Sequence, residues 1–295
     1  MRQVKHDDYV KINCERVAVW EENDVKEYFF PKAPDAQKWD SGSACIMTYG
    51  ERLGAAMLSA SACLRSGVGY TFLHVPQEMR VQVATALPAC IVEEMNGAPY
   101  PTRLLYGAIA LGMGSGVSEQ LYALIRHVLQ YYSQTLILDA DALTALAQFG
   151  LEPLKEKDPC NCEVILTPHL KEFAQLCGKS LEEVKEGGVA LAKSFAKEYG
   201  VTLVLKSNHT IITDGERVAI NMTGSPALAK AGSGDVLSGL LAGISASFLP
   251  FETACIASYI LGRAGELAEQ EFGQYAPTPT DIISLLPRVI KSLES

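Results

Sequence analysis

A glycine-rich loop with one acid runs directly into an apolar helical pattern over residues 221–246. Gly232, Ser233 and Gly234 carry little side-chain bulk, so their backbone N–H groups can face a ligand at a helix N-terminus, where unpaired amides favour an anion. Asp235 follows in the first turn, where a carboxylate can accept a proton from a substrate hydroxyl. The alternative is that Asp235 only caps its helix. We predict an anion hole with Asp235 as the catalytic base.

A second polar group follows the apolar run that ends at Leu166. Pro168 stops further strand pairing, so the polar residues after it should emerge at the edge of a sheet. His169 could hydrogen-bond a substrate or cap the next helix, and both interpretations remain open. Glu172 lies one turn later, where a carboxylate could orient Mg²⁺ or its waters.

Two further segments end apolar runs with residues suited to ligand binding. Asp139 and Asp141 stand between a predicted strand and a predicted helix, and we favour Asp141 as a helix N-cap over a metal or phosphate contact. Gly112, Gly114 and Gly116 follow another strand. Their spacing is not that of a dinucleotide fingerprint, so we expect them to give a ligand close access to the backbone.

The polar segment from Lys206 to Thr210 separates two β-rich runs. The Lys206 ammonium and the Thr210 hydroxyl could hold a nucleotide phosphate, and the alternative is an exposed hairpin turn. The chain contains no Walker A sequence, so any phosphate site must use another loop.

The elements that must position these residues alternate between β-rich and helical patterns from Ser43 onward, which indicates βα units around a mostly parallel sheet. The Asp214–Gly215 turn predicts that antiparallel strands edge this sheet. The predicted strands are 43–49, 69–75, 107–112, 135–139, 163–167, 201–206, 210–215 and 217–220, and the predicted helices are 54–67, 117–132, 141–149, 180–199, 233–248, 252–272 and 279–292. We expect a single domain over residues 1–295, with a less regular segment over 1–40.

Composition excludes several classes of protein. The chain has 295 residues and a formal net charge of −9, which disfavours a general nucleic-acid binder. No signal peptide or membrane span is expected, because the run Val236–Leu249 is too short to cross a bilayer. The eight cysteines are scattered, so a reducing cytoplasm fits best and neither disulfides nor a metal site at Cys160 and Cys162 are expected.

Four segments in order carry a family resemblance: LDADAL, TPHLKEF, VLKSNHT and MTGSPALAKAGSGDVLSG. Together they resemble the ADP/ATP-dependent NAD(P)H-hydrate dehydratases of the ribokinase-like superfamily, from about Lys38 to the C-terminus. The resemblance implies a three-layer αβα fold without the epimerase domain of two-domain relatives. The chain departs from the family pattern at Gln37, Trp39, Thr48, Tyr49 and Ala231.

The resemblance also implies a reaction, in which hydrated NADH or NADPH is dehydrated at the expense of ADP or ATP with Mg²⁺. Asp235 would be the base, and the family forms homo-oligomers. By motif match, the hydrated dinucleotide would contact Ala55, Gly114, His169 and Asp235. The adenine nucleotide would contact Lys206, Ser207, Asn208, His209, Thr210 and Gly234. The anion hole would be formed by Ala231, Gly232, Ser233 and Gly234, and Glu172 would face the metal through water.

Two other functions fit the same residues. A small-molecule kinase of this fold would keep Asp235 and the anion hole but would release a phosphorylated alcohol. A nucleotide-binding relative without catalysis would bind ADP or ATP and turn nothing over.

Overall fold

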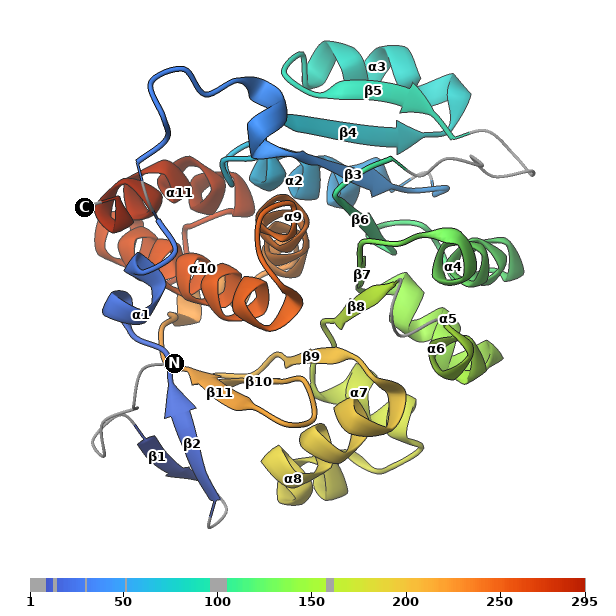
Figure 1. Cartoon of the computed structure of the whole chain (residues 1–295), viewed down its shortest axis with the longest axis vertical. Coiled ribbons are helices and arrows are strands. Elements are labelled where there is room, and N and C mark those ends of the chain that lie inside the picture. Colours follow the sequence, from blue (N-terminus) through green and yellow to red (C-terminus); the bar gives the residue numbers. More distant parts are fainter. Residues whose placement is uncertain are drawn as a thin grey trace.

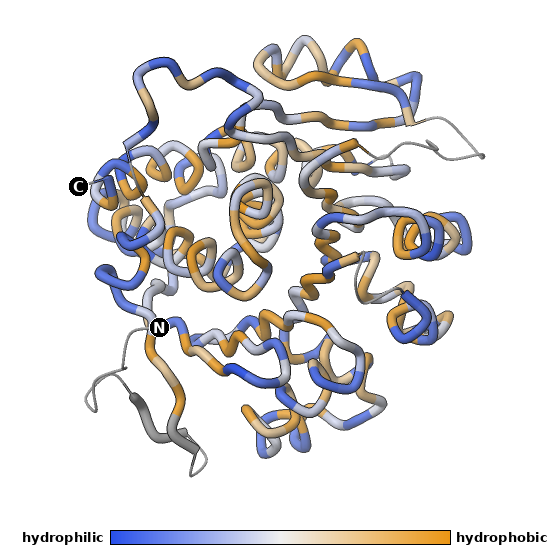
Figure 2. The backbone as a smooth tube through the Cα atoms, viewed as in Figure 1, coloured by the Kyte–Doolittle hydropathy of each residue, from blue (hydrophilic) through white to orange (hydrophobic). Residues whose placement is uncertain are grey.

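One mixed sheet with helices on both faces forms the body of the molecule (Figure 1). The computed structural model describes residues 9–12, 15–29, 31–50, 52–95, 105–157 and 162–294, with side chains from Val17 onward. Because helices cover both faces of this one sheet, the predicted three-layer αβα class is confirmed. Hydrophobic residues concentrate on the strands and on the inward faces of the helices (Figure 2).

The described strands are short, and all but β1, β2 and β5 coincide with predicted strands. They are β1 (Tyr9–Ile12), β2 (Glu15–Val19), β3 (Ser43–Met47), β4 (Tyr70–Val75), β5 (Ile91–Glu94), β6 (Ala108–Leu111), β7 (Thr135–Leu138), β8 (Glu163–Leu166), β9 (Thr202–Leu205), β10 (Thr210–Thr213) and β11 (Val218–Asn221). Their order in the sheet is β1-β2-β11-β10-β9-β8-β7-β6-β3-β4-β5.

The helices fill the intervals between the strands. They are α1 (Glu22–Lys26), α2 (Leu53–Cys63), α3 (Arg80–Ala86), α4 (Glu119–Tyr131), α5 (Asp141–Phe149), α6 (Glu152–Glu156), α7 (Leu170–Cys177), α8 (Leu181–Tyr199), α9 (Ser233–Ser245), α10 (Pro250–Phe272) and α11 (Pro279–Leu293). Three 3₁₀ turns cover Lys38–Ser41, Gln77–Met79 and Pro226–Leu228.

The seven neighbouring strands β5, β4, β3, β6, β7, β8 and β9 run parallel to one another. Strand β10 is antiparallel to both of its neighbours, β9 and β11. The chain builds outward from β3 through β4 to β5 and then returns to place β6 on the other side of β3. Such a reversal opens a crevice outside the carboxyl ends of the two strands, where parallel α/β sheets bind ligands. The carboxyl ends of β3 and β6 therefore mark where the site should lie.

Side chains alternate between two cores, as the period of a strand requires. In β6, Ala108 and Ala110 join the core under α2, α9, α10 and α11, while Ile109 and Leu111 join the core under α4, α5, α7 and α8. Small residues on the first face allow α9 to lie close to the sheet, which brings the glycine-rich loop onto its carboxyl end.

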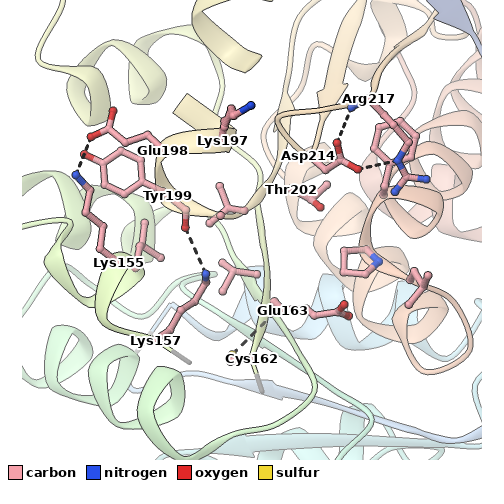
Figure 3. A pocket seen from close by; sticks show the side chains of 17 residues that line it. Lys155, Lys157, Cys162, Glu163, Lys197, Glu198, Tyr199, Thr202, Asp214 and Arg217 are labelled. Carbon is pink, nitrogen blue, oxygen red and sulfur yellow. Dashed lines mark hydrogen bonds and ion pairs between the residues drawn. The ribbon is translucent and has the colours of Figure 1, made fainter. Parts of the chain in front are cut away.

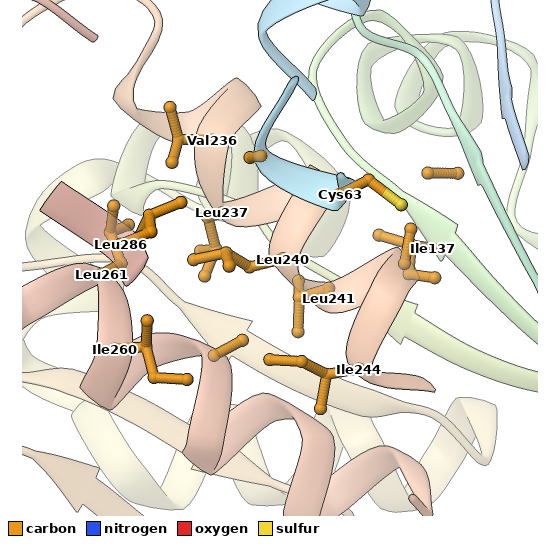
Figure 4. Packing of buried hydrophobic residues seen from close by; sticks show 14 of the residues in the cluster. Cys63, Ile137, Val236, Leu237, Leu240, Leu241, Ile244, Ile260, Leu261 and Leu286 are labelled. Atoms are coloured by element: carbon orange, nitrogen blue, oxygen red, sulfur yellow. The ribbon is translucent and has the colours of Figure 1, made fainter. Parts of the chain in front are cut away.

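Helix α9 coincides with the helix predicted over 233–248 and is buried along almost its whole length. Figure 4 shows how it packs against α10 and α11: the labelled residues are Val236, Leu237, Leu240, Leu241 and Ile244 from α9, Ile260 and Leu261 from α10, and Leu286 from α11. A Cβ on Gly239 would lie 2.0 Å from the Ser59 carbonyl oxygen of α2, and a Cβ on Gly243 would lie 1.8 Å from the hydroxyl of Ser66, just beyond the end of α2. The two helices therefore touch through their backbones.

The N-terminal part departs from the sequence prediction. Residues before Ser43 supply β1 and β2, and β2 pairs in parallel with β11, so the sheet extends beyond the predicted antiparallel strands. The six cysteines within the described ranges are unpaired, and Cys14 and Cys160 lie outside the described residues. No helix in the described part of the chain is long and apolar enough to cross a bilayer.

Candidate active site

The carboxyl ends of three neighbouring strands bring the predicted site residues together. β7 is followed by Asp139, β8 by Pro168 and His169, and β9 by Lys206. The Lys206 amide donates to the Pro168 carbonyl at 2.8 Å, and His169 pairs with Lys206 in a parallel bridge. Segments that are far apart in the sequence thus meet at one edge of the sheet.

A partly buried ion pair lies at the centre of this edge. The Lys206 ammonium lies 2.9 Å from Oδ1 of Asp139, and the Ser238 hydroxyl donates to Oδ2 of the same carboxylate at 2.7 Å. Asp139 is 2% exposed. A Cβ on Gly234 would lie 3.4 Å from the Lys206 Nζ, which places the start of α9 directly against the pair.

The charge of Asp139 is maintained by its partners. Burial alone would raise the pKa of this carboxyl, but the Lys206 ammonium and the hydrogen bonds from Lys206 and Ser238 hold the pKa below its ordinary value. The next residue, Ala140, has φ 49°, a conformation that costs energy for a residue with a Cβ. The chain thus turns sharply between Asp139 and Asp141.

The N-terminus of α9 offers free backbone donors, as predicted for an anion hole. Gly232, with φ 102°, precedes the helix in a left-handed conformation that suits glycine. The Ser233 amide donates to the Lys230 carbonyl at 3.2 Å. The amides of Ala231, Gly232 and Gly234 have no acceptor among the described residues. Three of the four predicted amides are therefore available to an anion.

Asp235 lies in the first turn of α9, one position after these donors, and is not the N-cap residue. Burial, followed by the charges of Asp139 and Asp141, raises the pKa of Asp235 to about 6, against the opposing charge of Lys206. A carboxyl group with that pKa is mostly ionised at pH 7 and yet more basic than an ordinary aspartate. Such a group is suited to accept a proton.

The loops after β3 and β6 pack together beside this centre. A Cβ on Gly50 would lie 1.9 Å from the Gly114 carbonyl, and one on Gly114 would lie 3.3 Å from the Cβ of Ala55. The Ser115 hydroxyl donates to the Thr48 hydroxyl at 3.3 Å. Ala55 and Gly114, both predicted to contact the substrate, are thus neighbours, and Thr48 holds the second loop in place.

The prediction that Asp141 caps its own helix is wrong. The N-cap position of α5 is Ala140, and no side chain caps it. Oδ2 of Asp141 instead accepts the Gly116 amide at 2.8 Å and lies 3.8 Å from the Arg52 guanidinium. Asp141 therefore fixes the glycine loop, because its helix begins at Asp141 itself, one residue earlier than an N-cap role for Asp141 would require.

His169 is the N-cap of α7, the second of the two interpretations left open. Its Nδ1 accepts the amides of Lys171 and Glu172 at 3.2 and 3.1 Å, and Oε2 of Glu172 accepts the His169 amide at 2.8 Å. This reciprocal pattern is a capping box. The His169 side chain is still 52% exposed, with Nε2 3.5 Å from Oε1 of Glu172, so a substrate contact stays a prediction.

The turn from Lys206 to Thr210 is an exposed hairpin turn between β9 and β10. Its hydroxyls are used locally: Ser207 donates to the His209 carbonyl at 2.6 Å, and Thr210 donates to the Ser207 carbonyl at 3.3 Å. The turn is ordered by its own hydrogen bonds and lies next to Lys206. Its role in nucleotide binding remains a prediction.

The described residues form no group of three or more metal-binding side chains. Asp139 is paired with Lys206, and one oxygen of Glu172 is used in the capping box. A single carboxylate oxygen suits Mg²⁺ that arrives with a nucleotide, because this ion keeps its waters and takes phosphate oxygens as ligands. The donor set fits a nucleotide-bound Mg²⁺ and does not fit a protein cage.

Two cavities lie at the opposite, amino ends of the strands. One of about 580 Å³ is lined by Lys157, Glu163, Thr202 and Arg217 among others, and Figure 3 shows the Lys157 side chain pointing to the Tyr199 carbonyl. The other, about 940 Å³, lies beside Ser41, Gly67 and Phe248. Neither cavity is lined by Asp235, Asp139 or Lys206. The candidate site is therefore identified by the contacts among its residues and not by a cavity.

Two residues of the site escaped the sequence analysis. Ser238 resembles any other small residue of an apolar helix, and Ser59, whose hydroxyl donates to the Asp235 carbonyl at 2.8 Å, lies on a different helix. Serine at a buried helical position was the available signal, because a buried hydroxyl needs a partner.

Comparisons with known proteins identify sequences similar to this chain. A family model described as NAD(P)H-hydrate dehydratase matches residues 46–288. The ADP-dependent (S)-NAD(P)H-hydrate dehydratase of Cenarchaeum symbiosum is 32% identical over 284 residues, which cover 92% of this chain and 96% of that protein. The bifunctional NAD(P)H-hydrate repair enzyme Nnr of Thermofilum pendens is also 32% identical, over 89% of this chain. The chain spans about half the length of that bifunctional relative, at 52%.

Solved structures give the same result. The ADP/ATP-dependent NAD(P)H-hydrate dehydratase of Bacillus subtilis, co-crystallised with ATP and Mg²⁺, has a TM-score of 0.82 and 28% identity, covering 94% of this chain and 99% of that one. A ribokinase-like superfamily protein of Enterococcus faecalis has a TM-score of 0.83 at 23% identity, covering 100% of this chain and 99% of that one, and shows the shared fold.

Proposed function

Because this chain belongs to the NAD(P)H-hydrate dehydratase family, we propose that it dehydrates hydrated NADH or NADPH to NADH or NADPH with ADP or ATP as phosphoryl donor. One observation carries the proposal. Asp235, with its pKa raised to about 6, stands next to the unpaired amides at the start of α9. A base and an anion hole side by side are what phosphoryl transfer to a hydroxyl group requires.

The chemistry explains why a nucleotide is consumed. Hydroxide is a poor leaving group, so the hydroxyl is first converted into a phosphate ester. Asp235 takes the hydroxyl proton while the oxygen bonds to the terminal phosphorus, and the bond from that phosphorus to the leaving AMP or ADP breaks. The C–O bond then breaks, phosphate leaves with its electron pair, and loss of a ring proton restores the dihydronicotinamide.

The amides of Ala231, Gly232 and Gly234 would stabilise the charge that develops on the transferred phosphoryl group. Mg²⁺ bound with the nucleotide would neutralise phosphate charge, and Glu172 is the residue that would face it through water. Lys206 already carries a positive charge at the same edge, 2.9 Å from Asp139.

The two substrates would enter from different sides of Asp235. The adenine nucleotide would lie over Gly234 and the turn from Lys206 to Thr210. The backbone pairing of Lys206 with His169 anchors this turn to the sheet. The hydrated dinucleotide would lie over Ala55 and Gly114, which are neighbours because the loops after β3 and β6 pack together. This arrangement would bring the hydroxyl up to the terminal phosphorus, with the Asp235 carboxylate within reach of the hydroxyl proton.

The test is to incubate the purified chain with hydrated NADH or hydrated NADPH, Mg²⁺, and either ADP or ATP. We expect the absorbance of reduced nicotinamide to appear together with one equivalent of free phosphate. A stable phosphoester would instead identify a kinase, and nucleotide binding without any product would identify a relative that lacks catalysis. Either of these results would overturn the proposal.

A further inference from the structure

We propose that Asp139 is a positioning residue for the site: it ties Lys206 on the nucleotide side to Ser238 on the helix that carries Asp235. This inference rests on the proposed function, because it assigns to Asp139 the task of holding the nucleotide phosphate and the base at a fixed separation. The residue touches neither substrate in the scheme above.

The contacts of Asp139 join three elements that have no covalent link near the site. The Asp139 carboxylate follows β7. It accepts a hydrogen bond of 2.9 Å from the ammonium of Lys206, which follows β9, and one of 2.7 Å from the hydroxyl of Ser238, which lies in α9. The Ser238 hydroxyl also lies 3.2 Å from the Gly234 carbonyl, inside the first turn that supplies the anion hole. One carboxylate therefore sets where both halves of the site stand.

The charges facing Asp235 come from each element packed around it. They are Asp139 after β7, Asp141 at the start of α5 and Lys206 after β9. Asp139 and Lys206 neutralise each other, so Asp235 stands beside a pair of low net charge and is not drawn into a salt bridge of its own. Without Asp139, the Lys206 ammonium would be free to pair with Asp235 and to lower its basicity.

The first experiment compares Asp139→Asn with Asp214→Asn. Asp214 is a matched control, because it holds Arg217 at 2.7 Å in a partly buried ion pair beside the cavity at the opposite end of the sheet. We expect Asp139→Asn to lower kcat by roughly tenfold to a hundredfold, with the KM for nucleotide changed by less than about threefold. The acidic limb of the kcat/KM profile should move to lower pH.

A purely structural role makes a different prediction. If Asp139 only stabilises the fold, both variants lose stability, and both keep the kcat and the pH profile of the parent enzyme. That result would overturn the inference.

A second set of variants keeps the inference testable if Asp139→Asn folds poorly. Lys206→Met removes the cation, and the double variant Asp139→Asn/Lys206→Met removes both charges, so neither is left buried alone. Because Asp139 also holds Ser238, the comparison is made with Ser238→Ala present in both variants, and there Asp139→Asn/Lys206→Met should have the kcat of Lys206→Met within about twofold. A larger further loss would mean that Asp139 acts on the substrate itself, and that result would overturn the inference.

The inference can be separated from the proposed function. If the parent chain turns over no hydrated NADH or NADPH, the proposed function fails, and the pKa of Asp235 can be followed directly by carboxyl NMR. The pKa should fall in Asp139→Asn and should stay unchanged in Asp214→Asn. An unchanged value in Asp139→Asn would overturn the positioning role in either case.

Discussion

Two lysines lie near opposite ends of the central strands, and their partners differ. At the carboxyl end, Lys206 is 22% exposed and pairs with the Asp139 carboxylate at 2.9 Å. Near the amino end, Lys157 is 7% exposed, and its ammonium donates to the Tyr199 carbonyl at 3.3 Å (Figure 3). No carboxylate in the described part of the chain pairs with Lys157.

The difference shows that the contribution of each lysine depends on the group that its ammonium contacts. A carboxylate keeps the Lys206 charge in place at the edge where a phosphate would bind. A carbonyl compensates only part of the cost of burying a charge, and burial lowers the pKa of Lys157 despite the opposing effect of Cys162. We therefore expect the Lys206 ammonium to be needed for stability, because Asp139 depends on it, and the Lys157 ammonium to add little or no stability.

The largest effect should come from removing the base. Asp235→Asn keeps the shape of the side chain and the free amides of α9 but cannot take a proton. We expect kcat to fall by about 10²- to 10⁴-fold, with ADP and ATP affinity within about threefold of the parent, measured by steady-state kinetics and calorimetry. Turnover close to that of the parent would show that Asp235 is not the base.

The second prediction compares the two lysines directly. Lys206→Met leaves the buried Asp139 unpaired, so the free energy of unfolding should fall by about 3 kcal/mol. Lys157→Met removes an ammonium without a carboxylate partner and should leave stability unchanged or raise it by about 1 kcal/mol. Urea denaturation of the three proteins at pH 7.5 measures both values. Equal losses would abolish the distinction between the two ends.

A smaller effect follows from the pKa of Asp235. Its folded value of about 6 exceeds the ordinary value of 3.8, so the native state binds more protons between these limits and loses stability as pH rises through about 6. Allowing for solvent screening, we expect the parent to lose about 2 kcal/mol relative to Asp235→Asn between pH 4 and pH 7. Denaturation at the two pH values would show a constant difference if Asp235 had an ordinary pKa.

The smallest effect is expected at the amino end and has the opposite sign. The folded pKa of Lys157 is lowered from 10.5, so the unfolded chain binds more protons and stability rises with pH in the window from the folded value up to 10.5. Lys157→Met lacks this rise. Thermal unfolding of both proteins from pH 7 to pH 10.5 should show the parent gaining on the variant, and parallel curves would contradict the lowered pKa.

Much of this architecture could be predicted, because local patterns encode it. The alternation of β-rich and helical runs gave the parallel sheet, and the glycine-rich loop before Asp235 gave the start of α9. The N-terminal strands β1 and β2 were not predicted, since β2 is placed by pairing with β11, about 200 residues away in the chain.

The parts of the site that could not be predicted depend on contacts between distant segments. Asp141 was expected to cap a helix next to it, but it accepts an amide 25 residues earlier. The Ser238 hydroxyl reaches a carboxylate 99 residues away. Residue type and spacing identified candidate groups, whereas the partner of each group depends on how the strands are ordered in the sheet.

The close approach of α2 and α9 limits how the molecule can move. Because Gly239 lets the two helices touch, and the Ser59 hydroxyl donates to the Asp235 carbonyl, we expect the ends that carry Ala55 and Asp235 to move together. A closing motion around bound substrates would then have to come from the exposed hairpin after Lys206. The hairpin would move over the bound ligands while α2 and α9 stay in place. Substitutions in that hairpin should therefore alter the rates of ligand association and release more than the rate of the chemical step.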